Sequence, residues 1–187
     1  MSGPVLIVPG WGNSGPKHWQ TLWEQAHPDF RRVVQRDWEY PVCTEWVETL
    51  DRTIQAAAAP PLLVAHSLGC IAVAHWARTG TAPVQAAFLV VPPDVEHPEF
   101  PPVIEGFAPI PRGRLAFPSI VVASRNDQYG DFDRSRALAE AWGSRFVDAG
   151  NSGHINADSG FGPWPLGESL FAELVQGAAA SNRRSES

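Results

Sequence analysis

Residues 60–74 decide the fold of this chain, and they read PPLLVAHSLGCIAVA. The apolar run is interrupted at Ser67, and apolar positions then recur with helical spacing. A buried strand that turns sharply into a helix at a serine is a nucleophile elbow, which lifts the serine Oγ to an exposed position. Small residues must flank the serine, and Ala65 and Gly69 give A-x-S-x-G in place of G-x-S-x-G. The alternative is that Ser67 is an ordinary helix N-cap.

Short apolar segments alternate with amphipathic ones along the whole chain. Besides the elbow strand, we expect strands at residues 5–8, 33–34, 86–91, 119–123 and 145–147, and helices at 17–26, 134–142 and 166–176 and from Thr44 as N-cap. Short strands without polar alternation, separated by helices, predict a parallel sheet that is covered on both faces. The predicted fold class is therefore α/β, with a doubly wound, mainly parallel sheet flanked by helices.

Length and composition indicate one globular domain. The chain has 187 residues, of which 44% are hydrophobic and 18% charged, enough to bury a single core. We assign residues 1–176 to one domain and the small, polar residues 177–187 to a frayed tail. We expect no membrane span, because no apolar run approaches about 20 residues. We expect no export signal, because no positively charged segment followed by an apolar signal core is visible before the first strand. The net charge of −6 and the scattered arginines argue against nucleic-acid binding.

The cysteines and histidines do not predict a cofactor. Cys43 and Cys70 are the chain's 2 cysteines, and they fit neither a disulfide framework nor a paired zinc spacing. We expect both to be reduced thiols in a cytoplasmic protein. No histidine pair or carboxylate cluster has metal-ligand spacing, so we expect a site without a metal.

The chain also supplies a base and an acid for Ser67. A serine hydroxyl becomes a strong nucleophile only when a base removes its proton, and a third group must hold that base in the right tautomer. Asp127 comes soon after the strand at 119–123, and His154 follows the strand at 145–147. The order Ser, Asp, His is that of the α/β-hydrolases. We therefore predict catalytic roles for Ser67, Asp127 and His154.

Other residues compete for these roles. Asp131 and Asp133 lie further from the strand end and are typical first-turn acids of the next helix. Asp158 is an alternative acid close after the candidate base. His66 adjoins the nucleophile and is expected to point roughly away from it. The remaining histidines lack a strand-end position, and they are His18, His27, His75 and His97. Among these, His18 is expected to lie nearest the site.

The loop after the first strand, residues 9–16, is expected to form part of an oxyanion hole. Backbone amides can supply both donors, and we predict those of Leu68 and Trp11. Gly10 and Gly12 would let the loop approach the substrate closely; the alternative is a merely tight strand-to-helix connection. We predict substrate contacts for Gly10, His18 and Trp164.

The segment 92–118 is crowded with prolines and cannot be a long regular helix. It leads from one strand to the next, so it should cross the rim where the carboxyl ends of the strands open. Two interpretations stay open. The segment is either an irregular connection or a small lid that forms a substrate wall.

Several motifs together resemble a known family. They are residues 8–14 (VPGWGNS), His18-Trp19, Asp37-Trp38, residues 65–69 (AHSLG), residues 124–127 (SRND) and residues 153–165 (GHINADSGFGPWP). The likeness is to the small serine hydrolases typified by retinoblastoma-binding protein 9 and the YdeN-like proteins, and it extends over about residues 5–176. The resemblance implies a compact α/β-hydrolase fold without a large cap domain. It also implies that Ser67, Asp127 and His154 are nucleophile, acid and base.

The motifs favour a serine hydrolase that cleaves small carboxylic esters through an acyl-enzyme. Amides or aminoacyl compounds would use the same residues, and the expected partner is a small-molecule substrate. A different hypothesis is a protein-binding module that keeps the hydrolase fold, because fold and function are separable; no particular protein partner is indicated. A dinucleotide-binding domain ranks lower, since Trp11 stands between the glycines of the formal Gly-x-Gly-x-x-Gly at residues 10–15 and Pro16 follows it.

Overall fold

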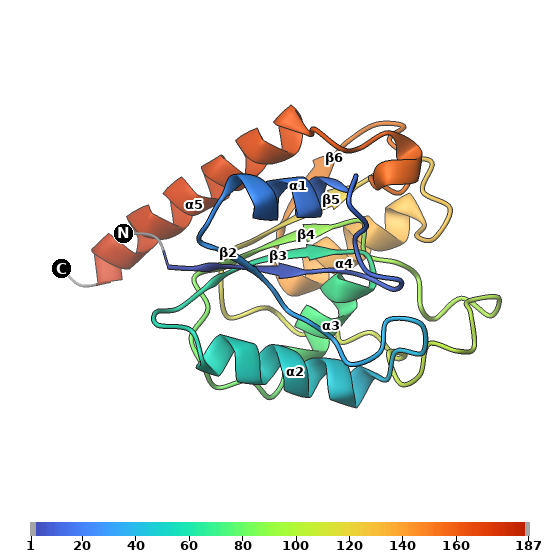
Figure 1. Cartoon of the computed structure of the whole chain (residues 1–187), viewed down its shortest axis with the longest axis horizontal. Coiled ribbons are helices and arrows are strands. Elements are labelled where there is room, and N and C mark those ends of the chain that lie inside the picture. Colours follow the sequence, from blue (N-terminus) through green and yellow to red (C-terminus); the bar gives the residue numbers. More distant parts are fainter. Residues whose placement is uncertain (1–2, 186–187) are drawn as a thin grey trace.

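The structure is a computed structural model that describes residues 3–185 (Figure 1). Its strands are β1 (Val5–Val8), β2 (Phe30–Arg32), β3 (Leu62–His66), β4 (Ala86–Val90), β5 (Ser119–Ala123) and β6 (Arg145–Asp148). Its α-helices are α1 (Trp19–Ala26), α2 (Cys43–Gln55), α3 (Leu68–Trp76), α4 (Phe132–Trp142) and α5 (Pro165–Ser185), and a 3-10 turn, η1, spans Ala157–Ser159. All strand pairs are parallel, in the order β2-β1-β3-β4-β5-β6. The predicted doubly wound α/β fold is confirmed, and no cap domain is inserted among the described residues.

The sheet separates two hydrophobic cores, because successive side chains of a strand point to opposite faces. Leu6 and Val8 of β1 pack with the buried side chains of α2, α3 and α4. Val5 and Ile7 pack on the other face with the apolar side chains of α1 and α5. Figure 1 shows α1 and α5 above the sheet and α2 and α3 below it. Both faces of the sheet are therefore covered, as the apolar strands predict.

The weakest predicted strand lies elsewhere than expected. Residues 33–34 were expected to form it, but β2 ends at Arg32. Val33 is buried and its amide still donates to Ile7, at 2.9 Å, whereas Val34 is largely exposed. As an edge strand, β2 pairs on one side only and carries polar residues, so its apolar pattern is too weak to place it from the sequence.

Helix α2 does not begin at the expected cap. Its N-cap position is Val42, with no side-chain hydrogen bond, and Thr44 is exposed within the first turn. The backbone amide of Cys43 instead donates to the carbonyl of Glu105, at 2.9 Å. The distant segment 92–118 thus satisfies a helix end that sequence reasoning assigned to a local side chain.

Helix α5 continues past the expected end at Gln176. Ala178 is still buried in the core, and the helix extends to Ser185. The residues 177–185 of the expected tail are therefore helical, and residues 186–187 lie outside the described part of the chain. Among the helices of residues 3–185, none combines the length and the apolar character needed to cross a membrane.

Candidate active site

Ser67 occupies the sharp turn between β3 and α3. Its backbone has φ 53° and ψ −126°, a conformation that residues other than glycine rarely adopt and that tends to occur at functional sites. Its side chain caps no amide of α3, so the N-cap interpretation does not describe it. The small residue at position 69 also has a physical reason. A Cβ on Gly69 would lie 2.3 Å from the carbonyl oxygen of Val8, so only glycine lets α3 pack against β1 here.

Ser67, His154 and Asp127 form one chain of hydrogen bonds. The Nε2 of His154 lies 2.8 Å from Ser67 Oγ, and its Nδ1 lies 2.8 and 2.9 Å from the two carboxylate oxygens of Asp127. A carboxylate only accepts, so Nδ1 carries the proton and Nε2 is free to accept from Ser67. The side chains of His154 and Asp127 are only 7% and 3% exposed. The predicted nucleophile, base and acid therefore lie in contact.

The loops that carry the acid and the base are joined by two polar residues that the sequence analysis did not select. Asn126 Oδ1 accepts from the amide of Gly153 at 2.7 Å. Ser124 Oγ accepts from the amide of Ser152 at 2.9 Å. Both follow β5, and each bond fixes the loop just before His154. Their position directly after a strand was the signal available, but their partners lie in a loop distant in sequence.

The competing carboxylates have other places. Asp131 is the N-cap of α4 and accepts from the amide of Arg134 at 3.0 Å, and Asp133 lies in the first turn of that helix. Both therefore act at the helix N-terminus, as expected. Asp158 lies in η1 at the wall of the cavity beside Ser67, while His154 Nδ1 is bonded to Asp127.

Two backbone amides beside Ser67 have no hydrogen-bond acceptor among residues 3–185, those of Trp11 and Leu68. Gly10 brings the loop of Trp11 close to the serine. A Cβ on Gly10 would lie 2.8 Å from the Ser67 Cβ and 3.2 Å from the Leu68 nitrogen. The loop thus approaches the serine as closely as a backbone without a side chain permits, and both amides are available to an incoming oxyanion.

His66 and His18 lie beside the candidate base. His66 was expected to point away from Ser67, but its Nε2 donates to the His154 carbonyl at 2.9 Å and its ring centroid lies 4.9 Å from that of His154. Burial lowers the pKa of His66 well below its usual value. Burial, then the nearby His154 and Arg32, lower the pKa of His18 to about 3. Both rings are therefore neutral near neutral pH, so they place no fixed positive charge beside His154.

His18 has a buried donor without a partner. Its Nδ1 accepts from the amide of Gln20 at 3.1 Å, which makes His18 the N-cap of α1 and starts that helix later than expected. In the neutral ring the proton is then on Nε2. That nitrogen has no hydrogen-bond partner among the described residues, and a buried donor left unpaired is unusual.

A cavity of about 380 Å³ opens at Ser67 and His154. Its apolar walls include Trp11, Leu68, Pro93, Phe100, Ile104 and Tyr129, and its polar wall includes Asn13, His18 and Asn156. Pro93, Phe100 and Ile104 come from the segment 92–118, so this segment contributes a wall as well as a connection. His18 lines the cavity as expected, whereas Gly10 lies against Ser67 and is not among the lining residues.

Trp164 is not part of this cavity. Its side chain is 3% exposed and packs in the core between α1, α5 and the sheet, with its ring centroid 5.0 Å from that of Trp19 and 6.0 Å from that of Phe88. The predicted substrate contact of Trp164 is therefore corrected. Proximity to His154 in sequence was misleading, because η1 lies between the two residues and the indole packs in the core.

The cysteines lie within the core, away from any exposed surface. Cys43 and Cys70 are both buried and free. Burial raises the pKa of both thiols, that of Cys43 to about 12, so both are protonated near neutral pH. Within the described residues, no group of three or more histidine, cysteine or acidic side chains is placed to hold a metal ion.

Solved structures with the same fold include two YdeN-type proteins. A protein named as a YdeN-like hydrolase, from Pectobacterium atrosepticum, is 33% identical with a TM-score of 0.84, over 95% of this chain and 92% of that one. The ydeN gene product of Bacillus subtilis is 21% identical with a TM-score of 0.77, over 94% of this chain and 100% of that one. An esterase domain from Rhodothermus marinus is 18% identical with a TM-score of 0.68, over 93% and 87%.

The family of the chain follows from its sequence match. No curated protein matches the chain. The family model described as serine hydrolase, however, matches residues 5–173, which include Ser67, Asp127 and His154. The chain therefore belongs to the serine hydrolase family.

Proposed function

We propose that Ser67, His154 and Asp127 are a catalytic triad that cleaves small carboxylic esters through an acyl-enzyme. The observation that supports this proposal most directly is the hydrogen-bond chain, with 2.8 Å from Ser67 Oγ to His154 Nε2 and 2.8 Å from His154 Nδ1 to Asp127. This is the arrangement that activates a serine. The strained backbone of Ser67 and the neighbouring free amides support the same assignment.

In the first half of the reaction, Ser67 Oγ bonds to the ester carbonyl carbon while its proton passes to His154 Nε2. The carbonyl oxygen becomes negative and accepts from the amides of Trp11 and Leu68. Asp127 stabilises the imidazolium and does not itself take the proton. The carbon–oxygen bond to the leaving alcohol then breaks, His154 returns the proton to that alcohol, and the acyl group stays on Ser67.

In the second half, water replaces the alcohol. His154 Nε2 accepts a proton from the water as its oxygen bonds to the acyl carbon, and the same amides hold the new oxyanion. The bond to Ser67 Oγ breaks, the serine regains its proton from His154, and the carboxylic acid leaves. An amide or aminoacyl substrate would follow the same steps with a more basic leaving group.

The cavity supports a small substrate. Its volume of about 380 Å³ lies at the lower end of ligand pockets, which are about 300–1,000 Å³, and its walls combine apolar side chains with a few polar groups. The esterase domain from Rhodothermus marinus and the monoacylglycerol lipase from Paleococcus ferrophilus share the fold and lend ester hydrolysis general support. We place this activity in the cytoplasm, on a single domain.

The test is labelling by a fluorophosphonate, followed by intact-mass measurement and peptide mapping. Wild-type protein should take up one probe per chain, on Ser67, and should hydrolyse p-nitrophenyl acetate. Ser67→Ala should lose both properties with its fold intact, whereas Ser169→Ala, which changes an exposed serine of α5, should keep both. Absence of labelling in folded wild-type protein would refute the proposal and favour a binding module on a hydrolase fold.

A further inference from the structure

The loop of residues 9–16 is held by a side chain from the edge strand β2. Arg32 Nη1 donates to Asn13 Oδ1 at 2.8 Å and to the Ser14 carbonyl at 2.9 Å. Its Nη2 donates to Thr21 Oγ1 at 2.8 Å, and its Nε donates to Glu24 at 2.9 Å. The Nη2 also forms an ion pair with Glu24 at 2.7 Å.

These contacts engage all three nitrogens of the guanidinium group. An arginine side chain has five N–H donors in a planar fork, and those of Arg32 form four hydrogen bonds and one ion pair. The side chain is only 13% exposed. The loop needs such support, because Asn13 has a φ of 65°, which is uncommon for a residue other than glycine. Arg32 therefore holds a strained turn in one conformation.

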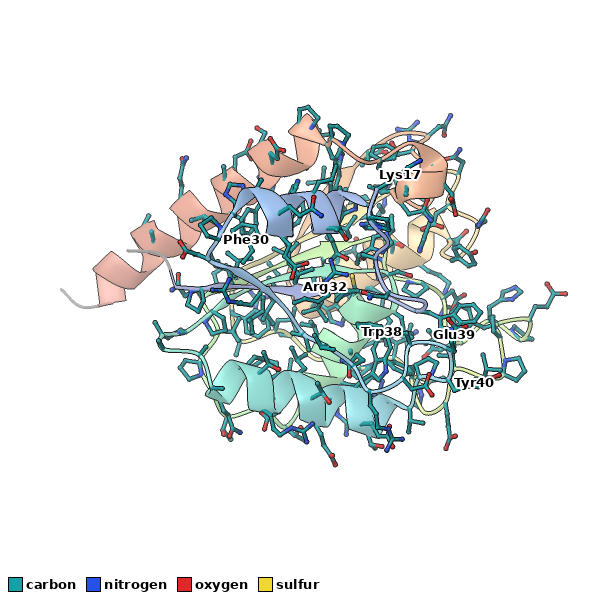
Figure 2. All side chains as sticks on the ribbon, viewed as in Figure 1. Lys17, Phe30, Arg32, Trp38, Glu39 and Tyr40 are labelled. Atoms are coloured by element: carbon teal, nitrogen blue, oxygen red, sulfur yellow. The ribbon has the colours of Figure 1, made fainter. Side chains whose placement is uncertain are left out.

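Residues 38–39, which follow β2, also hold the loop 9–16. The amide of Gly12 donates to the carbonyl of Trp38 at 3.0 Å, and the indole Nε1 of Trp11 donates to the carbonyl of Glu39 at 3.0 Å. Figure 2 labels Arg32, Trp38 and Glu39 along this part of the chain. Trp11 and Gly12 are thus fixed by residues 38–39, and the next two loop residues are fixed by Arg32.

A buried glutamine links this loop to the strands behind Ser67. Ser14 Oγ donates to Gln20 Oε1 at 2.6 Å. The amide group of Gln20, which is fully buried, donates to the Val64 carbonyl at 3.0 Å and lies 3.4 Å from the Val8 carbonyl. Since β3 leads directly into Ser67, the loop and the nucleophile are held by the same strand.

We propose that Arg32 is a positioning residue for the oxyanion hole, acting through the loop 9–16 to place the Trp11 amide beside Ser67. The inference rests on the proposed function, because it assigns the Trp11 amide to that reaction. Arg32 itself touches neither the substrate nor Ser67. Arg32 acts on the position of the Trp11 amide, and a misplacement of a catalytic group by about 1 Å can lower a rate about 10²-fold.

The test compares wild-type protein with Arg32→Met and Arg32→Lys in steady-state hydrolysis of p-nitrophenyl acetate. Arg32→Met should lower kcat by about 10-fold to 100-fold and leave KM within about threefold. This loss in kcat is smaller than that for a deleted oxyanion donor, which is about 10²–10³-fold. The rate of fluorophosphonate labelling at Ser67 should fall in parallel. Arg32→Lys should restore little of the loss, because an ammonium lacks the planar fork.

A double-mutant cycle separates positioning from general stability. Asn13→Gly removes the Oδ1 acceptor and tolerates the positive φ. If Arg32 acts through this loop, Arg32→Met combined with Asn13→Gly should be no slower than Arg32→Met alone. Two losses that multiply would contradict the inference. Should Arg32→Met fail to fold, Arg32→Lys takes its place in the same cycle.

Two further variants serve as controls. Arg31→Met makes the same change at the exposed neighbouring arginine and should leave kcat unchanged. Glu24→Gln removes the ion pair but leaves the bonds to Asn13 and Ser14, so kcat should stay within about twofold. An equal loss in Glu24→Gln, or an unchanged kcat in Arg32→Met, would overturn the inference while the proposed function stands. Absence of Ser67 labelling in the wild type would overturn both.

Discussion

Two segments enclose the candidate active site, and they are held in different ways. The loop 9–16 is tied to the sheet through Gln20, which accepts from Ser14 and donates to Val64 in buried hydrogen bonds. Arg32 adds a part-buried hydrogen bond to the Ser14 carbonyl and an exposed one to Asn13.

The segment 92–118 is bonded to neighbouring elements on both sides of its tip, by the amide of Asp94 to the Tyr129 carbonyl at 2.8 Å and by the carbonyl of Glu105 to the Cys43 amide at 2.9 Å. The tip itself, residues 97–104, makes hydrogen bonds only within the segment among the described residues. Beside the tip, Glu96 forms an ion pair with Arg134 of α4 at 2.5 Å. Exposed ion pairs contribute only about 0–1 kcal/mol each. The tip 97–104 therefore has fewer hydrogen bonds to neighbouring elements than the loop 9–16.

Exposure alone does not distinguish the two segments, because residues 11–13, 15 and 16 of the loop are exposed as well. Residues 97–99 and Val103 of the second segment are exposed, and its yellow-green part projects furthest at the right of Figure 1. Its Phe100 and Ile104 nevertheless line the cavity. The amide proposed to stabilise charge thus lies in a loop bonded to several neighbouring elements, while the tip that carries two cavity-wall residues is bonded only within its own segment.

The largest expected effect comes from adding one methyl group to the loop 9–16. In Gly10→Ala the new Cβ would lie 2.8 Å from the Ser67 Cβ, so either the serine or the Trp11 amide must shift. We expect kcat for p-nitrophenyl acetate to fall about 10²–10³-fold, comparable to the loss of one oxyanion donor. Steady-state kinetics with a circular dichroism check of folding measure this.

The matched control adds the same methyl group to the segment 92–118. A Cβ on Gly113 would meet nothing within 4 Å, so Gly113→Ala should keep wild-type kcat. A wild-type rate in Gly10→Ala would remove the contrast between the two segments. It would also show that the close approach of the loop to Ser67 is not needed for turnover.

The sequence predicts the residues of the candidate site better than the contacts that position them. The elbow, Asp127 and His154 could be found because each directly follows an apolar strand, and parallel strands bring their carboxyl ends to one edge. Arg32 and Gln20 carry no such signal. Arg32 belongs to an edge strand that the sequence places at residues 33–34, after its actual position. Gln20 lies in an amphipathic helix, and no sequence pattern predicts the partners of a buried glutamine. The predicted substrate contact of Trp164 is wrong for the opposite reason, because Trp164 is close to His154 in sequence but its side chain lies in the core and not at the cavity.

A smaller effect on the kinetic constants is expected from a change in the apolar wall of the cavity. Phe100→Ala removes a side chain that lines the cavity but lies away from the hydrogen-bond chain, so it should weaken binding in the ground and transition states alike. We expect KM for p-nitrophenyl butyrate to rise about 3-fold to 10-fold with kcat within about twofold, and a smaller rise for the acetate. Val103→Ala, at an exposed position of the same segment, should change neither constant. A loss in kcat alone would mean that this wall also serves the chemistry.

The smallest expected effect is on the free energy of unfolding at low pH, to which the two segments should contribute in different pH ranges. The pKa of His18, beside the loop 9–16, is lowered from 6.5 to about 3 mainly by burial. Between these two pH values, His18 binds a proton in the unfolded chain but not in the folded protein. The free energy of unfolding therefore falls as the pH drops from about 6.5 towards 3. The pKa of Glu96 is lowered from 4.5 to about 2, first by Arg112. Its contribution is complete above about pH 4.5 and is lost as the pH falls towards 2.

Urea midpoints measured from pH 7 to pH 3 distinguish the two contributions. His18→Asn replaces the titrating ring with another N-cap residue and should flatten the decline between pH 6.5 and 4.5 in part, because the buried His66 still contributes there. Glu96→Gln should leave that range unchanged and flatten the decline only below about pH 4.5, by a small amount because its ion pairs are partly exposed. A change in the upper range with Glu96→Gln would show that the two segments are coupled, and they could then not be treated as separately held.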